Sequence, residues 1–268
     1  MEFKQGTLES LVMDFRFWKN KRVLLTGHTG FKGSWLSLWL QKLGTNLTGF
    51  SNDIPTKPSL FDIAHVGEGM NSIFGDVRDF DVLKKVMEES KPEIVIHMAA
   101  QAILRKSYRD PTDTYSTNVM GTVNILNAIR HSNSVRVSLI VTSDKCYEMK
   151  DEIKSYKEDY PMGGYDPYSN SKGCAELVTS SFRNSFFNKS NFEKHHVAIA
   201  SARAGNVIGG GDWGEDRLVP DIMKGIINNE NIIIRNPNSI RPWQFVLDPL
   251  NGYLQLIQNH SSMLLNKL

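Results

Sequence analysis

A tyrosine and a lysine stand four positions apart, at Tyr168 and Lys172, so that on a helix their side chains would share one face. An ammonium beside a phenol lowers the pKa of the phenol from its ordinary value of about 10, and the tyrosinate could then act as a base near neutral pH. Because such spacing also arises by chance, the position of the pair matters more. The pair opens a helix expected over 168–187, directly after a long loop, and we therefore expect it at an edge of the sheet where ligands bind.

Three residues with exchangeable protons, Ser143, Asp144 and Lys145, follow the strand expected over 137–142. A hydroxyl, a carboxylic acid and an amine at one strand end could together move several protons. The polar cap of an ordinary strand would have the same composition. A catalytic role is favoured over a simple cap because this strand leads into the same loop that precedes Tyr168.

The glycines Gly27, Gly30 and Gly33 are spaced GxxGxxG and lie between a strand expected over 22–26 and a helix expected from Phe31. Glycines let a backbone turn sharply and approach a pyrophosphate, whose charge is favoured by free amides at the start of a helix. A glycine cluster at such a turn can also be purely structural, but its placement favours a dinucleotide site.

An acidic residue, Asp53, follows the second expected strand twenty positions after Gly33, where a carboxylate would accept hydrogen bonds from an adenosine ribose diol. It would also repel a 2′-phosphate, and no arginine lies within 45–56 to receive one, so NAD is favoured over NADP. The alternative is that Asn52 and Asp53 form only a turn. The residues expected to contact NAD, with Asp76 and Val77 at its adenine ring, are Gly27, Thr29, Gly30, Phe31, Lys32, Gly33, Asp53, Asp76, Val77, Ala99, Ala100, Tyr168 and Lys172.

Guanidinium groups in the last third of the chain suit the diphosphate of a nucleotide sugar, because their forked donors match phosphate oxygens. On this ground we expect Arg217 to contact substrate. The four candidate arginines are Arg203, Arg217, Arg235 and Arg241.

The elements that must position these residues alternate along the first two thirds of the chain. Short apolar runs are separated by longer amphipathic stretches, which predicts a parallel sheet covered by helices on both faces. The expected fold is α/β, a Rossmann-like doubly wound parallel sheet over 17–202, followed over 203–268 by a small substrate-binding lobe. The expected strands are 22–26, 46–50, 72–74, 94–97, 137–142 and 197–202, and the helices are 31–43, 80–89, 112–130 and 168–187. Beyond 216 the pattern predicts a helix at 219–228, a strand at 232–234 and a helix at 249–258.

Composition argues against several other classes of protein. The 268 residues carry 31 basic and 29 acidic side chains, scattered without the stripe that nucleic acid binding needs. No apolar run approaches the roughly 18 residues of a membrane span, and charges at positions 2, 4 and 9 interrupt any secretory leader. Cys146 and Cys174 lack metal-binding spacing, so we expect reduced thiols, no metal and a cytoplasmic location.

Longer blocks of sequence make these motifs specific, namely 26–35, 141–148, 163–176, 202–213 and 234–243. Through them the chain resembles the extended short-chain dehydrogenases that act on nucleotide sugars, and within these the NAD-dependent 4,6-dehydratases. The resemblance covers nearly all of 18–250. It implies CDP-glucose as the substrate, NAD that stays bound, a homodimer formed through the helices at 112–130 and 168–187, and a role in making deoxysugars for surface polysaccharides.

The resemblance also implies a role for each residue of the catalytic cluster. Tyr168, assisted by Lys172, would take the proton of the C4 hydroxyl while hydride passes from C4 to NAD, and Ser143 would hydrogen-bond the C4 oxygen. Asp144 would protonate the departing C6 hydroxyl and Lys145 would take the C5 proton, after which the hydride returns to C6. Related dTDP-glucose dehydratases have Asp and Glu at these two positions, and Lys145 can act as a base only when neutral.

The substrate lobe is where the resemblance is least complete. Asn206 and Arg241 match residues that hold the substrate diphosphate, but relatives continue well past 243, and 261–268 does not resemble their continuation. We therefore expect a truncated lobe. The alternatives that stay open are another nucleotide-sugar dehydratase or an epimerase of the same superfamily and, from a different class, a catalytically silent NAD-binding homologue. The acid at Asp144, which epimerisation does not need, favours dehydration.

Overall fold

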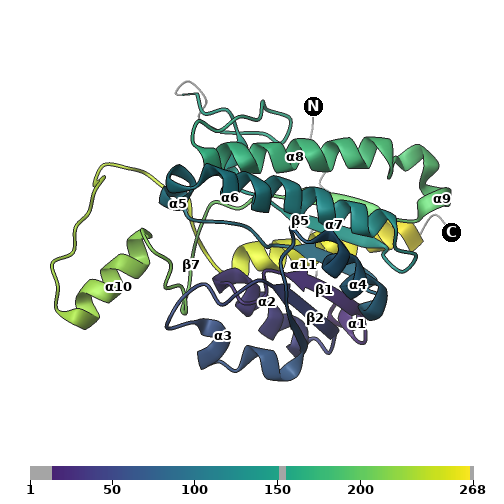
Figure 1. Cartoon of the computed structure of the whole chain (residues 1–268), viewed down its shortest axis with the longest axis horizontal. Coiled ribbons are helices and arrows are strands. Elements are labelled where there is room, and N and C mark those ends of the chain that lie inside the picture. Colours follow the sequence, from purple (N-terminus) through teal and green to yellow (C-terminus); the bar gives the residue numbers. More distant parts are fainter. Residues whose placement is uncertain (1–13, 151–154, 266–268) are drawn as a thin grey trace.

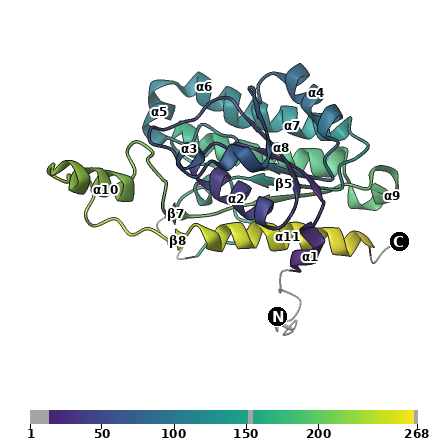
Figure 2. The ribbon, with the colours of Figure 1, turned by 90° about the horizontal axis from the view of Figure 1, so that it is seen from below.

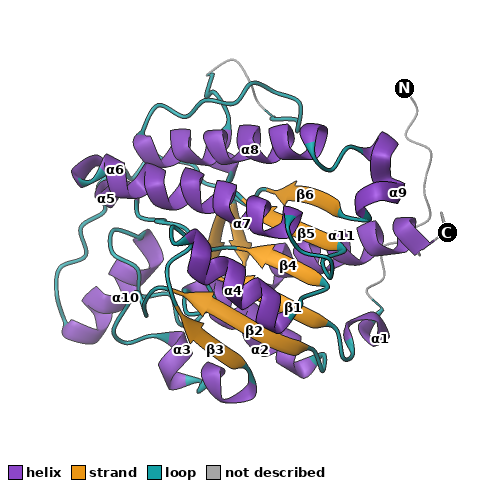
Figure 3. Ribbon diagram, turned by 45° about the vertical axis from the view of Figure 1, so that its right-hand side comes forward, coloured by secondary structure: helices purple, strands orange, loops and turns teal. Residues whose placement is uncertain are grey.

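The computed structural model describes residues 14–150 and 155–265, and its centre is one sheet of six parallel strands (Figure 3). The strands lie in the order β3-β2-β1-β4-β5-β6, so the chain starts near the middle and winds outward in both directions. This is the order of dinucleotide-binding doubly wound sheets, and it confirms the fold predicted from the sequence. The predicted strands are present with ends that differ by at most one residue: β1 (Arg22–Thr26), β2 (Asn46–Ser51), β3 (Asn71–Phe74), β4 (Ile94–His97), β5 (Val137–Val141) and β6 (Ala198–Ala202).

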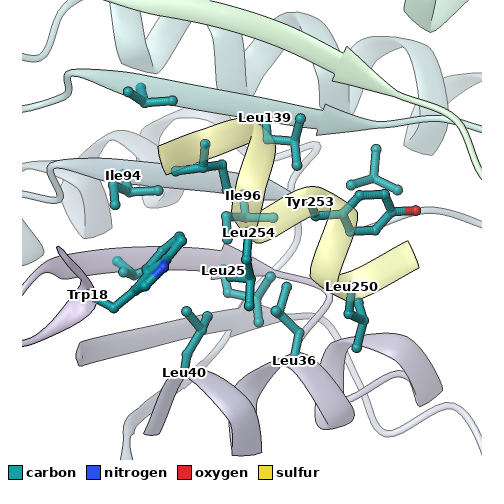
Figure 4. Close-up of a cluster of buried hydrophobic side chains, with 14 of the residues drawn as sticks. Trp18, Leu25, Leu36, Leu40, Ile94, Ile96, Leu139, Leu250, Tyr253 and Leu254 are labelled. Carbon is teal, nitrogen blue, oxygen red and sulfur yellow. The ribbon is translucent and has the colours of Figure 1, made fainter. Parts of the chain in front are cut away.

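One face of the sheet is covered by helices from opposite ends of the chain. Successive side chains of a strand point to opposite faces, and on this face Leu25 and Ile96 pack with α2 (Phe31–Lys42) and α11 (Leu247–Leu265). Figure 4 shows this core, with Leu250 of α11 beside the strands. Helix α11 packs on the sheet, whereas α10 lies away from it (Figure 2). Both helices fall within the lobe predicted over 203–268. The domain boundary predicted between 202 and 203 stays a prediction.

The other face of the sheet carries the helices from the middle of the chain. Leu24 and Val95 point to this face and pack in a second apolar core with α4 (Phe80–Ser90) and α7 (Gly121–Arg130). Helix α8 (Pro167–Ser185) lies beside α7 (Figure 1). The two long helices thus cover the half of the sheet that ends in β5 and β6.

The helix predicted over 112–130 is divided in the structure. A π-helical turn, Ser116–Met120, separates α6 (Pro111–Tyr115) from α7. The remaining short helices are α1 (Phe15–Trp18), α3 (Leu60–Ile63), α5 (Leu104–Arg109) and α9 (Phe192–His195).

The last third departs from the sequence prediction in its strands. The predicted strand at 232–234 is wrong, because these isoleucines lie in the irregular, exposed segment 229–242 with no strand beside them among the described residues. A small parallel sheet forms instead from β7 (Asn206–Ile208), where no strand was predicted, and β8 (Trp243–Phe245). Helix α10 (Leu218–Asn228) was predicted and stands out from the body of the molecule (Figures 1 and 2). Helix α11 is longer than the predicted 249–258.

Two further properties concern the described ranges, 14–150 and 155–265. No helix there is both long and apolar enough to cross a bilayer. Within the same ranges, no group of three His, Cys, Asp or Glu side chains is placed to hold a metal ion.

Candidate active site

The glycine turn joins β1 to α2, and packing requires glycine at its first and third positions. Gly27 has a φ of +77°, and a Cβ there would lie 2.7 Å from the backbone nitrogen of Ala99. A Cβ at Gly33 would lie 1.9 Å from the carbonyl oxygen of Gly27, which α2 could not tolerate. At Gly30 a Cβ would meet that oxygen at an ordinary 3.5 Å, so the fold itself makes no demand for glycine there. Glycine at this position therefore suits the close approach of a ligand.

The first turn of α2 has the properties of an anion site. Its N-cap residue, Gly30, has no side chain to bond the free N–H groups, and the aligned peptide dipoles place partial positive charge at this end of the helix. A pyrophosphate is bound by such groups. The residues present therefore fit a dinucleotide, with Phe31 and Lys32 contributing the first backbone N–H groups of the helix.

The residue predicted to bind the ribose lies next to the glycine turn. Thr29 Oγ1 donates a hydrogen bond of 2.6 Å to the backbone carbonyl of Asp53, and this bond ties the turn to the segment that follows β2. The Asp53 side chain is exposed. A carboxylate so placed can accept hydrogen bonds from a ribose diol, and this role stays a prediction.

The predicted adenine contacts are already engaged by neighbouring side chains. Arg78 Nε lies 2.9 Å from both carboxylate oxygens of Asp76, and the hydrogen bonds from Arg78 lower the pKa of that carboxyl. Val77 is buried against Gly121 of α7. The contact of Asp76 and Val77 with an adenine stays a prediction. Ala99, by contrast, is half-buried beside the glycine turn, and Ala100 follows it.

Ser143 begins a tight turn at the carboxyl end of β5. Its hydroxyl accepts a hydrogen bond from the backbone nitrogen of Lys145 at 3.3 Å and donates one to Asp144 Oδ1 at 3.1 Å. These bonds cap a single 3-10 turn over Asp144–Cys146. The segment 143–146 is called the Ser143 turn below.

Helix α8 brings Tyr168 to the Ser143 turn. Asp166 caps the helix by accepting a hydrogen bond from the backbone nitrogen of Ser169 at 2.8 Å. The phenol of Tyr168 lies close enough to Ser143 for that side chain to lower its pKa, and Lys145 Nζ lies 6.0 Å from the centroid of its ring. The hydroxyl, amine and phenol predicted to do chemistry therefore meet at one edge of the sheet.

The pKa of Tyr168 is raised rather than lowered, which corrects the expectation from spacing. Burial is the main cause, and it outweighs the effects of the Ser143 side chain and of the positive charge of Arg217, which both lower this pKa. The ammonium of Lys172 is directed at β5, where it donates to the carbonyl of Val141 at 3.4 Å. Both side chains therefore lie at the carboxyl end of β5, with the ammonium bonded to the strand backbone. Their roles in the site stay predictions.

Two ammonium groups lie in the site, on the buried Lys172 and the half-buried Lys32. Burial is the main cause that lowers the pKa of each to about 8. Lys32 Nζ lies 3.4 Å from the hydroxyl of Tyr253, a buried residue of α11 whose own pKa is raised by burial. Sequence reasoning missed Tyr253, because its surroundings in the sequence indicate only an amphipathic helix.

Three of the four candidate phosphate arginines are paired with carboxylates. The pairs are Arg203 with Glu176 at 2.9 Å, Arg217 with Asp212 at 2.8 Å and Arg235 with Asp216 at 2.6 Å. Arg203 is largely buried in its pair, so a phosphate would have to compete with Glu176 for this guanidinium. Arg217 is more exposed and lies close enough to Tyr168 to lower the pKa of its phenol.

The small sheet brings together the two residues matched to diphosphate ligands. Strands β7 and β8 are parallel, and the backbone nitrogen of Asn206 donates to the carbonyl of Pro242 at 3.1 Å. Arg241 precedes that proline and is exposed. Their role in binding substrate stays a prediction.

A family model matches most of the chain. The model of the NAD-dependent epimerase/dehydratase family matches residues 23–267. The chain belongs to this family. Membership confirms that the protein is of an NAD-dependent enzyme class, as the glycine turn and Tyr168 indicated from the sequence.

Individual relatives narrow the comparison. The chain is 58% identical over 247 residues to the CDP-glucose 4,6-dehydratase of Salmonella typhimurium, an alignment that covers 92% of this chain and 69% of the relative. The solved structure of the epimerase Mth375 from Methanothermobacter thermautotrophicus matches with a TM-score of 0.80 and 26% identity, over 92% of this chain and 70% of that one. The dTDP-glucose 4,6-dehydratase DesIV from Streptomyces venezuelae shares the fold, with a TM-score of 0.76 and 19% identity over 88% of this chain and 71% of that one.

Proposed function

We propose that this protein is a CDP-glucose 4,6-dehydratase, which converts CDP-glucose to CDP-4-dehydro-6-deoxyglucose. The observation that carries the proposal is the meeting of Tyr168 with a turn that holds both an acid and an amine, Asp144 and Lys145. Oxidation at C4 needs only the first of these groups, whereas loss of water across C5 and C6 needs all three. The 58% identity to a CDP-glucose 4,6-dehydratase supports the same reaction and substrate.

Tyr168 takes the proton of the C4 hydroxyl. When bound, NAD supplies the hydride chemistry, accepting hydride from C4 and later returning it to C6. Ser143 would hydrogen-bond the C4 oxygen, because its side chain lies near the Tyr168 phenol, where it acts on the pKa of that group. The Ser143 side chain and the charge of Arg217 both favour the tyrosinate, against the effect of burial.

The Ser143 turn performs the elimination. Once C4 is a ketone, the C5 proton is acidified, and the free amine of Lys145 removes it. Asp144, as the protonated acid, gives its proton to the C6 oxygen, which leaves as water. Lys145 returns its proton to C5 when hydride reaches C6, so that the net change in the sugar is the loss of one water molecule.

Substrate binding is assigned to the C-terminal third. Arg217 and Arg241 would pair with the two phosphates, and the amide of Asn206 would hydrogen-bond an adjoining oxygen. Arg217 is at present held by Asp212, at 2.8 and 2.9 Å, so substrate would compete with that carboxylate.

The protein is further proposed to act as a homodimer in the cytoplasm. Helices α7 and α8 lie side by side (Figure 1), and exposed apolar side chains occur on α8 and just before α7, with Leu177 60% exposed and Met120 50% exposed. Both cysteines are free thiols, as in a reducing compartment. Analytical ultracentrifugation of the wild type and of Leu177→Glu tests the dimer, and a wild type that sediments as a monomer contradicts it.

Incubation of the protein with CDP-glucose and NAD tests the reaction. The expected product is a 4-keto-6-deoxy sugar, detected by mass spectrometry as the loss of one water. UDP-glucose and dTDP-glucose in parallel reactions test the choice of nucleotide. An isomer of unchanged mass would indicate an epimerase, and bound NAD without any conversion would indicate a silent homologue.

A further inference from the structure

A carboxylate that the proposed mechanism does not use lies directly behind the catalytic residues. Glu176 is one helical turn after Lys172 on α8, and its side chain is 6% exposed. It accepts hydrogen bonds from Thr142 Oγ1, from Ser201 Oγ at 2.7 Å, and from Arg203 Nε and Nη2 at 2.9 and 3.1 Å. One buried carboxylate thus receives four hydrogen bonds from the ends of two neighbouring strands.

These partners lie on both sides of the Ser143 turn. Thr142 immediately precedes the turn. Arg203 reaches the residue that follows it, since Nη1 donates to the Tyr147 hydroxyl at 2.7 Å and the guanidinium carbon lies 4.8 Å from the centroid of that ring. The pair of Glu176 and Arg203 therefore holds the two ends of the turn and ties them to α8.

We propose that Glu176 is a positioning residue of the active site, whose buried ion pair with Arg203 holds the Ser143 turn in register with Tyr168 and Lys172. Its effect on rate rests on the dehydratase function proposed above, whereas the coupling of Glu176 to Lys172 can be measured without turnover. Glu176 is assigned no contact with substrate or cofactor.

An ion pair is a costly way to fill this part of the core. Well-packed apolar side chains often replace a buried ion pair with no loss of stability, because both charges give up their hydration on burial. Apolar side chains cannot, however, provide four directed hydrogen bonds to one group. They also cannot place a negative charge beside Lys172.

The negative charge of Glu176 raises the pKa of Lys172, whereas burial and the charge of Lys32 lower it. Lys172 interacts electrostatically with four titratable groups: Lys32 of α2, His97 of β4, Cys146 in the Ser143 turn and Glu176. Burial lowers the pKa of His97 to about 3 and raises that of Cys146 to about 12, so both groups are neutral at pH 7. Glu176 therefore supplies the negative charge that favours protonated Lys172, against burial and Lys32.

The central experiment compares wild type with Glu176→Gln, which keeps the shape of the side chain and removes its charge. The titration of the Lys172 side chain is followed by NMR on protein with isotope-labelled lysine, and its signal is assigned with Lys172→Met. The expected result is that Lys172 titrates at lower pH in Glu176→Gln. The alkaline limb of the dependence of kcat on pH should also move to lower pH. In addition, kcat should fall on the order of 10-fold with little change in KM, because the Ser143 turn is misplaced.

Two further variants separate positioning from folding. Glu176→Gln leaves Arg203 buried without its partner, so the double variant Glu176→Gln/Arg203→Met removes that cation and should recover thermal stability. Its Lys172 titration should remain shifted. The matched control is Thr179→Val, which alters a buried side chain on the same helix whose hydroxyl donates to the Ala175 carbonyl. This variant should leave the Lys172 titration and kcat unchanged.

An unchanged Lys172 titration in Glu176→Gln would overturn the proposal, as would a double variant that regains both stability and full kcat. Each result would reduce Glu176 to a structural role. Failure of the proposed function has a different signature, since a wild type that does not convert CDP-glucose still reports the Lys172 titration. In that case a shifted titration supports the coupling while the dehydratase assignment falls.

Discussion

The two turns that form the site are held in place by different forces. The glycine turn is fixed by sterics, because Gly27 and Gly33 leave no room for a Cβ and bring β1, β4 and α2 into close contact. The Ser143 turn is fixed by side-chain hydrogen bonds and by the buried pair of Glu176 and Arg203. Substitutions at the first turn should therefore act through shape and cofactor affinity, and substitutions around the second through charge and rate.

The strongest test of this contrast is Tyr168→Phe. It removes the phenol hydroxyl while the glycine turn is untouched, so turnover of CDP-glucose should fall on the order of 10² to 10⁴-fold with NAD still bound. Steady-state kinetics and a cofactor titration measure the two effects. Undiminished turnover would contradict the assignment of Tyr168 as the base.

The variant Lys145→Met should separate the oxidation step from the elimination step. Oxidation at C4 should survive, because Tyr168 and Ser143 remain, whereas the C5 proton has no acceptor. We expect NADH absorbance to develop on mixing with CDP-glucose while no dehydrated product forms. Normal turnover, or no NADH at all, would assign Lys145 to substrate positioning instead.

A matched pair of alanines tests the steric turn. Gly33→Ala places a methyl group against the carbonyl of Gly27 and should lower the free energy of unfolding by about 1 to 3 kcal/mol. Gly30→Ala has room in the fold, so its stability should stay near that of wild type while its affinity for NAD falls. Thermal unfolding without cofactor and NAD titration distinguish them, and equal losses of stability would refute the contrast.

The buried ammonium of Lys172 predicts a dependence of stability on pH. Its pKa is lowered from 10.5 to about 8 by burial, so the unfolded chain binds this proton more tightly. The group therefore lowers stability fully below about pH 8, and this penalty fades as the pH rises toward 10.5. Lys172→Met should raise the free energy of unfolding at pH 7 by on the order of 1 to 3 kcal/mol while it abolishes turnover. Denaturant unfolding at pH 7 and at pH 10 should show the gain shrinking with pH.

The smallest effect is expected at Asp53, which is exposed. Asp53→Ala should weaken NAD binding modestly and narrow the preference for NAD over NADP, because it removes both a ribose acceptor and the charge that repels a 2′-phosphate. Parallel titrations with the two cofactors measure this. Equal binding of both cofactors by wild type would make Asp53 a turn residue only.

The sequence predicts well what depends on local pattern. The glycine spacing locates the turn, and the apolar runs around Leu24 and Val95 locate the strands. Such runs are informative because the side chains of a buried strand have apolar neighbours along its whole length. The isoleucines at 232–234 also have a strand composition, but a strand needs a partner, and the chain pairs β7 with β8 instead.

What the sequence could not predict depends on distant segments meeting. Tyr253 reaches Lys32 only because α11 packs beneath the sheet. Glu176 and Arg203 pair across 27 positions of the chain, and neither residue type distinguishes a buried pair from a solvated surface charge. The raised pKa of Tyr168 likewise reflects burial, which a four-residue spacing cannot report.

The position of α11 has a consequence for how the protein is made. The apolar face that includes Leu25 is completed by a helix that begins at Leu247, so a growing chain cannot cover it until that helix has left the ribosome. At 5–20 residues per second, the intervening synthesis takes roughly 10 to 50 s. During that interval the part of this face that α11 covers stays exposed, and it can associate with apolar surfaces of other unfinished chains.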